Sequence, residues 1–231
     1  MVASNIKQEK TLLEELKDAC KDVWHEYTHP EFIDQLQDGS LDIEKFRYYL
    51  KQDYLYLLHY TRCFALMAYK GENLEEIQFA LEGTLWITEG ELELHRQYKD
   101  WGIDTHELED SEESIECIAY TRYMKDVGMS GDYLDLMIAI ASCYIGYGEI
   151  GQRLLADEKT IFEGNPYKEW ISMYGGEGYQ SSTIEFVEKL NSYGKDISKK
   201  KLDKLKVIFR EVTRLEVAFW DMGMRGDKKV K

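Results

Sequence analysis

The stretch from Leu136 to Leu155, LMIAIASCYIGYGEIGQRLL, places reactive side chains directly after a nearly unbroken apolar run. Cys143 and Tyr147 stand four residues apart, so they share one face if this stretch is helical. The glycines at 146, 148 and 151 leave space beside that face for a ligand or for a closely packed neighbour. A thiol and a phenol that face one space would suit nucleophilic chemistry. On spacing alone, the alternative is a buried helix in which the cysteine serves as a small hydrophobic residue.

A second motif, HEYTH from His25 to His29, fits the H-E-x-x-H pattern of zinc peptidases. In that pattern two histidines one helical turn apart hold zinc, and the glutamate acts as the base. Pro30 follows the second histidine at once, so the helix should end where that ligand must be held. No third ligand is evident downstream. We therefore interpret these histidines as residues of a helix end and predict no metal site.

Two further patterns favour other classes of protein only weakly. Gly146 to Gly151 fits G-x-G-x-x-G, but a dinucleotide site needs a preceding strand in a βαβ unit, and the flanking segments look helical. A di-iron bundle, and with it a metal-dependent oxygenase, would need a pair of Glu-x-x-His motifs, and only Glu26–His29 supplies one. The acidic run that contains Glu89, Glu91, Glu93 and His95 is interpreted as a solvated helix face.

The composition limits the possible partners. The chain has 231 residues with 44% hydrophobic and 32% charged residues, which fits one domain with a sizeable core. A net charge of -15 repels phosphate backbones, so we expect no nucleic-acid partner. No apolar run reaches the ~20 residues that a spanning helix needs, and the N-terminus lacks a signal-peptide core, so we expect no membrane partner. The four scattered cysteines are most simply free thiols in a reducing cytoplasm.

Hydrophobic periodicity predicts an all-α protein. The chain has only 2 prolines, which favours long helices over many strands and turns. Helix caps are expected at Ser40 or Asp42 and at Ser111 or Ser114. Residues 102–112 are expected to form an acidic loop. We predict a single helical domain over residues 1–231, with helices over residues 5–27, 32–36, 43–69, 74–100, 115–127, 132–157, 181–193 and 198–222 and a short helix between Asn165-Pro166 and Gly175-Gly176.

Five stretches form an ordered set along the chain: HPEFIDQLQDGSLDIEKFRYYLKQDYLYL (29–57), AYTRYM (119–124), ASCYIGYGEIG (141–151), YKEWISMYGG (167–176) and RLEVAFWDM (214–222). In this order and approximate spacing they resemble the TenA, or thiaminase II, family, over nearly the whole chain. The resemblance implies a helical bundle with the architecture of haem oxygenase but without haem, usually assembled as a homotetramer. It also implies hydrolysis of an aminomethyl- or formylaminomethyl-pyrimidine, or of thiamin itself, to the hydroxymethylpyrimidine used in thiamin salvage.

The resemblance assigns catalytic roles to individual residues. Cys143 in ASCYIGY occupies the position of the family's nucleophile, which implies the cysteine-bearing branch, the aminopyrimidine aminohydrolases. Glu216 in RLEVAFW matches the acid/base glutamate. Tyr56 in LKQDYLY matches the tyrosine that contacts and activates the cysteine. No metal or organic cofactor is implied.

The resemblance also assigns substrate-binding residues. Asp53 matches the aspartate that hydrogen-bonds the pyrimidine, and the tyrosines that line the substrate correspond to Tyr120, Tyr147 and Tyr174. Gly148 stands where some relatives carry an aromatic residue, and Tyr123 stands where some carry histidine. These departures affect the shape of the pocket and hence substrate preference more than the type of reaction.

The residue types agree with the chemistry that the resemblance implies. Addition of a thiolate to a pyrimidine breaks its aromaticity, so that the exocyclic amine can leave, water can add and the thiolate can depart. This scheme needs a nucleophile, an acid/base and a ring anchor, which are the types of Cys143, Glu216 and Asp53. The acid/base role requires burial that raises the pKa of the glutamate.

Two alternatives remain open at the level of sequence. Each carboxylate could serve only in an ion pair on its own helix, with arginine or lysine neighbours at positions 47, 51, 210 and 214. The protein could also be a non-catalytic helical pyrimidine- or thiamin-binding protein with a regulatory role.

Overall fold

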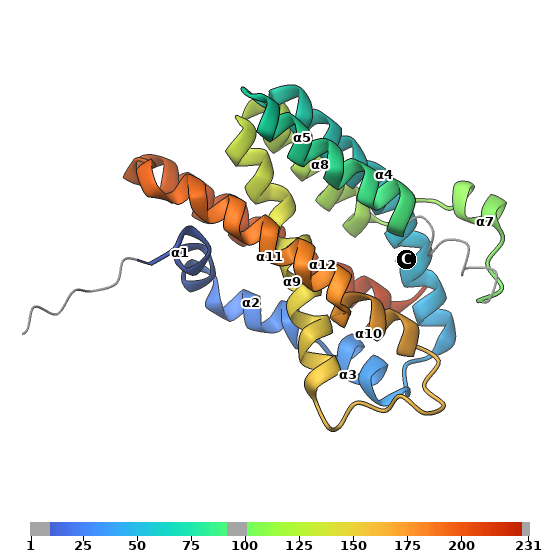
Figure 1. Ribbon diagram of the computed structural model, residues 1–231. Helices are drawn as coiled ribbons and strands as arrows, with labels where there is room; N and C mark the ends of the chain where they lie inside the picture. Colours follow the sequence, from blue (N-terminus) through green and yellow to red (C-terminus); the bar gives the residue numbers. More distant parts are fainter. Residues whose placement is uncertain (1–9, 92–100, 228–231) are drawn as a thin grey trace, which may run out of the picture.

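The computed structural model describes residues 10–91 and 101–227 of the chain. Over these residues the protein is built of helices and contains no β-strand (Figure 1). This confirms the predicted all-α class. The helices are α1 (Leu12–Ala19), α2 (Lys21–Thr28), α3 (Glu31–Asp38), α4 (Ile43–Lys70), α5 (Leu74–Leu85), η1 (Trp86–Glu91), α7 (Thr105–Glu109), α8 (Ile115–Ser130), α9 (Tyr133–Ala156), α10 (Lys168–Gly175), α11 (Glu177–Ser192), η2 (Tyr193–Asp196) and α12 (Lys199–Arg225).

Helix α9 forms the centre of the bundle and contacts α2, α4, α8, α10, α11 and α12 (Figure 1). Its start is fixed by a reciprocal cap between Asp132 and Asp135. The side chain of each residue accepts a hydrogen bond from the backbone N–H of the other. By length and composition α9 is apolar enough to cross a membrane, but 89% of its apolar window is buried within the protein. The helix that carries Cys143 is therefore the core helix of the fold.

Caps define the starts of the helices that surround α9. Asp42 accepts from the backbone N–H groups of Glu44 and Lys45 at the start of α4. Ser114 accepts from Cys117 N at the start of α8, and Ser198 accepts from Lys201 N at the start of α12. Of the alternatives that the sequence left open, Asp42 and Ser114 are the caps.

The N-terminal helix differs from its prediction. Residues 5–9 lie outside the described residues, and the remainder of the predicted helix is divided between α1 and α2 at Cys20, where φ is -135° and ψ is 31°. The two segments share α12 as a partner but differ in the other helix that they contact, which is α11 for α1 and α9 for α2. Tertiary packing therefore overrides a periodicity that would have suited one straight helix.

The region after α5 differs as well. The predicted helix 74–100 is α-helical only to Leu85 and continues as the π-helix η1, where Thr88 Oγ1 donates to the carbonyl of Thr84. The rest of that prediction, residues 92–100, lies outside the described residues. The predicted acidic loop contains the short helix α7, capped by Asp104, which is too short to give a periodic signal.

Candidate active site

Cys143 is the part-exposed cysteine of a chain whose other thiols are buried. Its neighbours on α9 are buried, and the side chains of Cys20, Cys63 and Cys117 are buried elsewhere in the core. All four cysteines are free thiols. Burial raises the pKa of the Cys63 thiol to about 12 and also raises the pKa of Cys117. Access therefore favours Cys143 as the reactive thiol.

Glu216 on α12 lies beside Cys143 and is only 2% exposed. Its Oε1 accepts a 2.7 Å hydrogen bond from the hydroxyl of Tyr120 on α8, and its carboxyl also forms a hydrogen bond with the Cys143 thiol. Burial raises the pKa of Glu216 to about 8, against the two hydrogen bonds, which lower it. A carboxyl with this pKa exchanges a proton near neutral pH, as an acid/base group must.

Asp53 on α4 is the second carboxyl of the site and is partly buried. Burial raises the pKa of Asp53 to about 7. Burial is the main cause of the raised pKa of both Glu216 and Tyr147, and the negative charge of Asp53 raises both further. The two carboxyls thus lie within electrostatic reach of each other although they come from different helices.

Tyr56 lies one helical turn after Asp53. Its ring packs 4.9 Å from that of Tyr120, and the two hydroxyls interact. The hydroxyl of Tyr56 donates to Met124 Sδ at 3.7 Å. Burial raises the pKa of Tyr56 well above its usual value, and the nearby Cys143 raises it further. Tyr56 is therefore close to Cys143, while its activation of the thiol stays a prediction.

Tyr147 and Tyr174 belong to an aromatic cluster next to these groups. The ring of Tyr147 lies 4.9 Å from Tyr174, 5.3 Å from Trp220 and 5.8 Å from Trp170. Its hydroxyl shares a 3.1 Å hydrogen bond with the hydroxyl of Tyr49. These rings supply flat apolar walls with polar tips, which suit a flat heteroaromatic ligand.

The ion-pair alternatives for the two carboxylates are wrong. Arg47 pairs with Glu44 and donates to the carbonyl of Gly102, while Lys51 pairs with Glu107. On α12 the corresponding cations also have other partners: Arg210 pairs with Asp22, and Arg214 pairs with Glu211. The basic neighbours of Asp53 and Glu216 are therefore engaged on the protein surface.

The glycines of α9 provide room for packed neighbours. A Cβ on Gly146 would lie 2.0 Å from the ring of Tyr27, whose hydroxyl donates to the carbonyl of Ser142. A Cβ on Gly151 would lie 2.3 Å from the backbone of Tyr174. Of the two roles that the sequence left open for these glycines, close packing is the one observed, and at Gly151 it brings Tyr174 against α9.

The remaining sequence motifs have structural roles. Helix α2 ends at Thr28, so His29 lies at its C-cap, and the rings of His25 and His29 lie 4.4 Å apart, tilted by 33°. Gly146–Gly151 lies inside α9 and forms no strand-to-helix turn. Among the residues that the structure describes, no group of three His, Cys, Asp or Glu side chains could hold a metal ion. Glu93 and His95 lie outside those residues.

Sequence reasoning missed three aromatic residues of the site. Tyr49 lies on α4 one turn before Asp53 and could have been found from this spacing. Trp170 and Trp220 are buried among the tyrosines, in the same motifs as Tyr174 and Glu216, but nothing in their spacing distinguishes a site residue from a core residue.

Comparison with known proteins agrees with this fold. The family model described as TENA/THI-4/PQQC family matches residues 17–226. An aminopyrimidine aminohydrolase of Halalkalibacterium halodurans is 38% identical over 213 residues, which cover 90% of this chain and 92% of that protein.

Solved structures give the same result. The crystal structure of a TenA family transcription regulator from Silicibacter sp. TM1040 matches with a TM-score of 0.87 and 34% identity, over 92% of this chain and 96% of that chain. A domain of unknown function from Shewanella denitrificans, described as having a heme oxygenase-like fold, reaches a TM-score of 0.71 over 90% of each chain at 17% identity. That likeness confirms the architecture. The chain therefore belongs to the TENA/THI-4/PQQC family.

Proposed function

We propose that this protein is a hydrolase of thiamin salvage with Cys143 as its nucleophile. It converts aminomethyl- or formylaminomethyl-pyrimidine to hydroxymethylpyrimidine with release of the amine, and it cleaves thiamin to pyrimidine and thiazole. The observation that carries the proposal is the hydrogen-bonded set of Cys143, Glu216 and Tyr120, which joins a part-exposed thiol to a carboxyl whose pKa is raised to about 8. The name of the Halalkalibacterium relative supports the same class of reaction.

The pyrimidine binds among the aromatic rings. Tyr120, Tyr147 and Tyr174 stack against or border the ring, and the Asp53 carboxylate accepts a hydrogen bond from its exocyclic amine. Burial disfavours the charged form of Asp53 and raises its pKa to about 7. A hydrogen bond from the ligand would stabilise the charged form.

In the first half of the reaction, the Glu216 carboxylate takes the thiol proton while the Cys143 sulfur bonds to a ring carbon. The displaced ring electrons move to a ring nitrogen, and the ring is no longer aromatic. Glu216 then gives its proton to the nitrogen of the aminomethyl group, which is the leaving group and not the amine held by Asp53. The carbon–nitrogen bond breaks with the return of the ring electrons, so the amine leaves and an exocyclic methylene remains.

In the second half, Glu216 takes a proton from water as the water oxygen bonds to the methylene carbon. The carbon–sulfur bond then breaks, the ring becomes aromatic again, and the thiolate recovers a proton from Glu216. The sum is one water consumed, one amine released and an unchanged enzyme. No step needs a metal or an organic cofactor.

The test is an assay for ammonia release from aminomethylpyrimidine, with Cys143→Ser as the control. Turnover that the control abolishes would support the proposal. Binding at micromolar concentration without turnover would instead support the alternative, a non-catalytic pyrimidine- or thiamin-binding regulatory protein. One observation favours that alternative: the Silicibacter structure is described as a transcription regulator.

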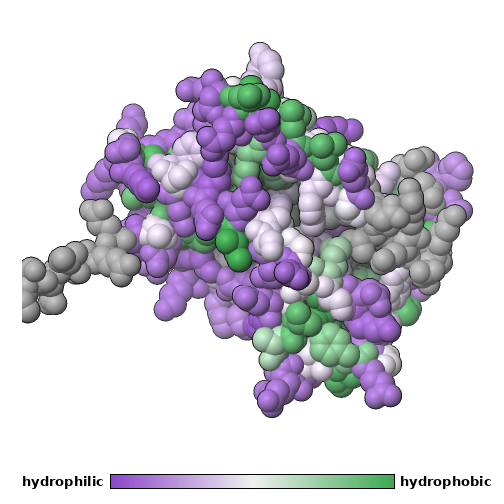
Figure 2. All heavy atoms as spheres, viewed as in Figure 1, coloured by the Kyte–Doolittle hydropathy of each residue, from purple (hydrophilic) through white to green (hydrophobic). Residues whose placement is uncertain are grey.

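We also propose that the protein is a cytoplasmic homotetramer and does not bind nucleic acid. Large apolar side chains are exposed on α5 and α8, including Leu74 at 68%, Leu85 at 53% and Ile115 at 73%, and Figure 2 shows hydrophobic side chains at the surface over α5. Such side chains suit an interface between subunits. A scattering mass near 27.2 kDa, the mass of one chain, across micromolar concentrations would contradict the tetramer.

A further inference from the structure

Gln52 on α4 has a buried side-chain amide that forms hydrogen bonds with the segment preceding α8. It is only 2% exposed. Its Nε2 donates to the carbonyl of Glu112 at 2.9 Å, and its Oε1 accepts from the backbone N–H of Ser114 at 2.8 Å. One side chain thus satisfies a backbone acceptor and a backbone donor on either side of Glu113, which fixes the position of this segment along α4.

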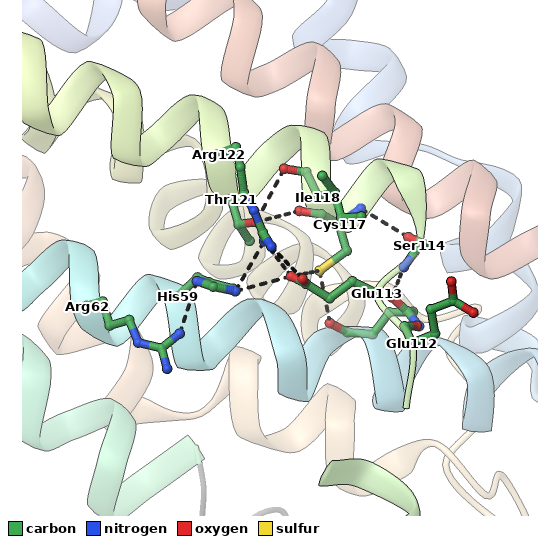
Figure 3. Close-up of polar contacts among 10 residues, drawn as sticks. His59, Arg62, Glu112, Glu113, Ser114, Cys117, Ile118, Thr121 and Arg122 are labelled. Carbon is green, nitrogen blue, oxygen red and sulfur yellow. Dashed lines mark hydrogen bonds and ion pairs between the residues drawn. The ribbon is translucent and has the colours of Figure 1, made fainter. Parts of the chain in front are cut away.

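The same end of α8 is tied to α4 and α12 by further contacts. Cys117 Sγ donates to the carbonyl of Gln52 at 3.7 Å. The hydroxyl of Ser114 caps Cys117 N and donates to Met222 Sδ at 2.9 Å, and Arg225 pairs with Glu116 at 2.7 Å. Figure 3 shows Glu112, Ser114 and Cys117 gathered at this end of the helix. The first turn of α8 therefore has a fixed axial position relative to α4 and α12.

A third group of contacts extends this junction along the two helices. Both terminal nitrogens of Arg122 donate to the carboxylate of Glu113, at 2.5 and 2.6 Å. His59 on α4 lies 3.1 Å from the same carboxylate (Figure 3). These groups are part-exposed, whereas the side chain of Gln52 is buried.

Residues on either side of Gln52 on α4, and one that follows Ser114 on α8, belong to the proposed active site. Tyr49 and Tyr56 lie one turn before and one turn after Gln52, and Asp53 adjoins it in sequence. On α8, Tyr120 follows Ser114 by about 9 Å along the axis. The rings of Tyr56 and Tyr120 meet at 4.9 Å, so the contact between the two helices continues directly into the site.

We propose that Gln52 is a positioning residue for this reaction: by fixing the register of α8 on α4, it places the hydroxyl of Tyr120 on Glu216. The proposal rests on the function proposed above. A hydrogen bond of 2.7 Å loses strength steeply when its donor moves. Loss of the Gln52 amide would therefore act on Glu216 through Tyr120, although Gln52 touches neither the substrate nor the reacting atoms.

The test compares Gln52→Met with Gln37→Met. Methionine is close to glutamine in length and forms neither amide hydrogen bond. Gln37 is a matched control, because it is 9% exposed and its Nε2 donates to Asp157 and Thr160 in the connection after α9, away from the site. We expect Gln52→Met to lower kcat roughly 10- to 100-fold with little change in KM. We expect Gln37→Met to leave kcat and KM unchanged while lowering the melting temperature.

A double variant separates positioning from simple loss of stability. In a Tyr120→Phe background, Gln52→Met should cause little further loss of kcat, because the hydroxyl that it positions is absent. The proposal would be overturned if the double variant lost as much kcat as the product of the losses in the two single variants. An unchanged kcat in Gln52→Met alone would overturn it as well. Gln52→Glu, which keeps the acceptor for Ser114 N–H and loses the donor to Glu112, should give an intermediate loss if Gln52→Met does not fold.

A second measurement does not depend on turnover. Difference infrared spectroscopy follows the protonated carboxyl of Glu216, with Glu216→Gln identifying its band. Gln52→Met should raise the pKa of Glu216 and Gln37→Met should not, since only the former displaces the Tyr120 hydrogen bond. An unchanged pKa in Gln52→Met would contradict the proposal. If the wild-type protein releases no ammonia, the proposed function fails, while this titration still decides the role of Gln52.

Discussion

The hydroxyl of Tyr120 on α8 donates a 2.7 Å hydrogen bond to Oε1 of Glu216 on α12. This bond stabilises the charged carboxylate and so opposes burial, which raises the pKa of Glu216. Tyr120→Phe should therefore raise that pKa further above about 8. Because the proposed reaction begins with the carboxylate, the rising limb of the kcat/KM profile should move to higher pH. Activity below the pKa should fall about tenfold for each unit of the shift. A limb that keeps its position would show that Tyr120 does not act on Glu216.

The buried carboxyl of Glu216 makes stability depend on pH. Its pKa is raised from 4.5 to about 8 in the folded protein. The stability linked to its protonated form is therefore fully present below pH 4.5 and lost as the pH rises through about 8. Glu216→Gln cannot ionise, so above pH 8 it should be more stable than the wild type by a few kcal/mol. Urea unfolding at pH 5 and at pH 8.5 measures this difference.

The control for this prediction is Glu211→Gln on the same helix. Glu211 lies at the surface in an ion pair with Arg214, so its substitution should change stability by less than about 1 kcal/mol at either pH. If the free energy of unfolding depended on pH equally in Glu216→Gln and the wild type, ionisation of Glu216 would not destabilise the folded protein.

Cys143 should be the thiol that reacts first. The other cysteines are buried, so one equivalent of iodoacetamide should label the native protein at Cys143 and abolish turnover. Cys143→Ser and Cys143→Ala should have no turnover but should bind hydroxymethylpyrimidine nearly as well as the wild type. Cys63→Ala should retain activity. Near-normal turnover in Cys143→Ser would remove the nucleophile assignment.

Asp53 and Glu216 should differ in the kinetic parameter that they control. Asp53→Ala removes the proposed acceptor for the exocyclic amine of the pyrimidine, so it should mainly raise KM, by roughly 10-fold or more. Glu216→Gln keeps the shape of the side chain but removes the proton exchange, so it should mainly lower kcat, by about 100-fold or more. Steady-state kinetics with aminomethylpyrimidine would contradict both assignments if each variant changed the same parameter.

Gly146 should tolerate no side chain, because Tyr27 occupies the space beside it. Gly146→Ala would place a Cβ 2.0 Å from the Tyr27 ring, so it should destabilise the fold by about 1–3 kcal/mol or more. Gly178 on α11 is the matched control, since a Cβ there meets nothing within 4 Å, and Gly178→Ala should be neutral or slightly stabilising. Thermal unfolding of the two variants compares them directly, and equal melting temperatures would contradict the packing argument.

Helix type and caps could be predicted from the sequence, but breaks within helices could not. Asp42 and Ser114 were recognisable as caps because their side chains bond to the backbone of the next turn, which is a local interaction. The break at Cys20 depends instead on α1 packing against α11 and α2 packing against α9. The π-helix after Leu85 and the short helix α7 likewise give no clear hydrophobic periodicity in the sequence.

For the site, the residue types could be predicted but their partners could not. Cys143, Glu216 and Asp53 were identified from their motifs, yet the sequence offered Arg210 and Arg214 as partners of Glu216. The structure gives it Tyr120 instead. The difference arises because neighbours on one helix can be seen in the sequence, whereas contacts between α8 and α12 depend on how the helices pack. The role of Gln52 is hidden for the same reason.

The burial of α9 has a consequence for how the protein is made. The helices α10, α11 and α12, which supply much of its cover, all follow it in the chain. At about 5–20 residues per second, α12 is completed roughly 3–14 seconds after α9. During that interval a helix apolar enough to cross a membrane lacks the part of its cover that α10, α11 and α12 supply. We therefore expect the yield of folded protein in the cell to depend on chaperones that shield nascent apolar helices, and to fall sharply when they are depleted.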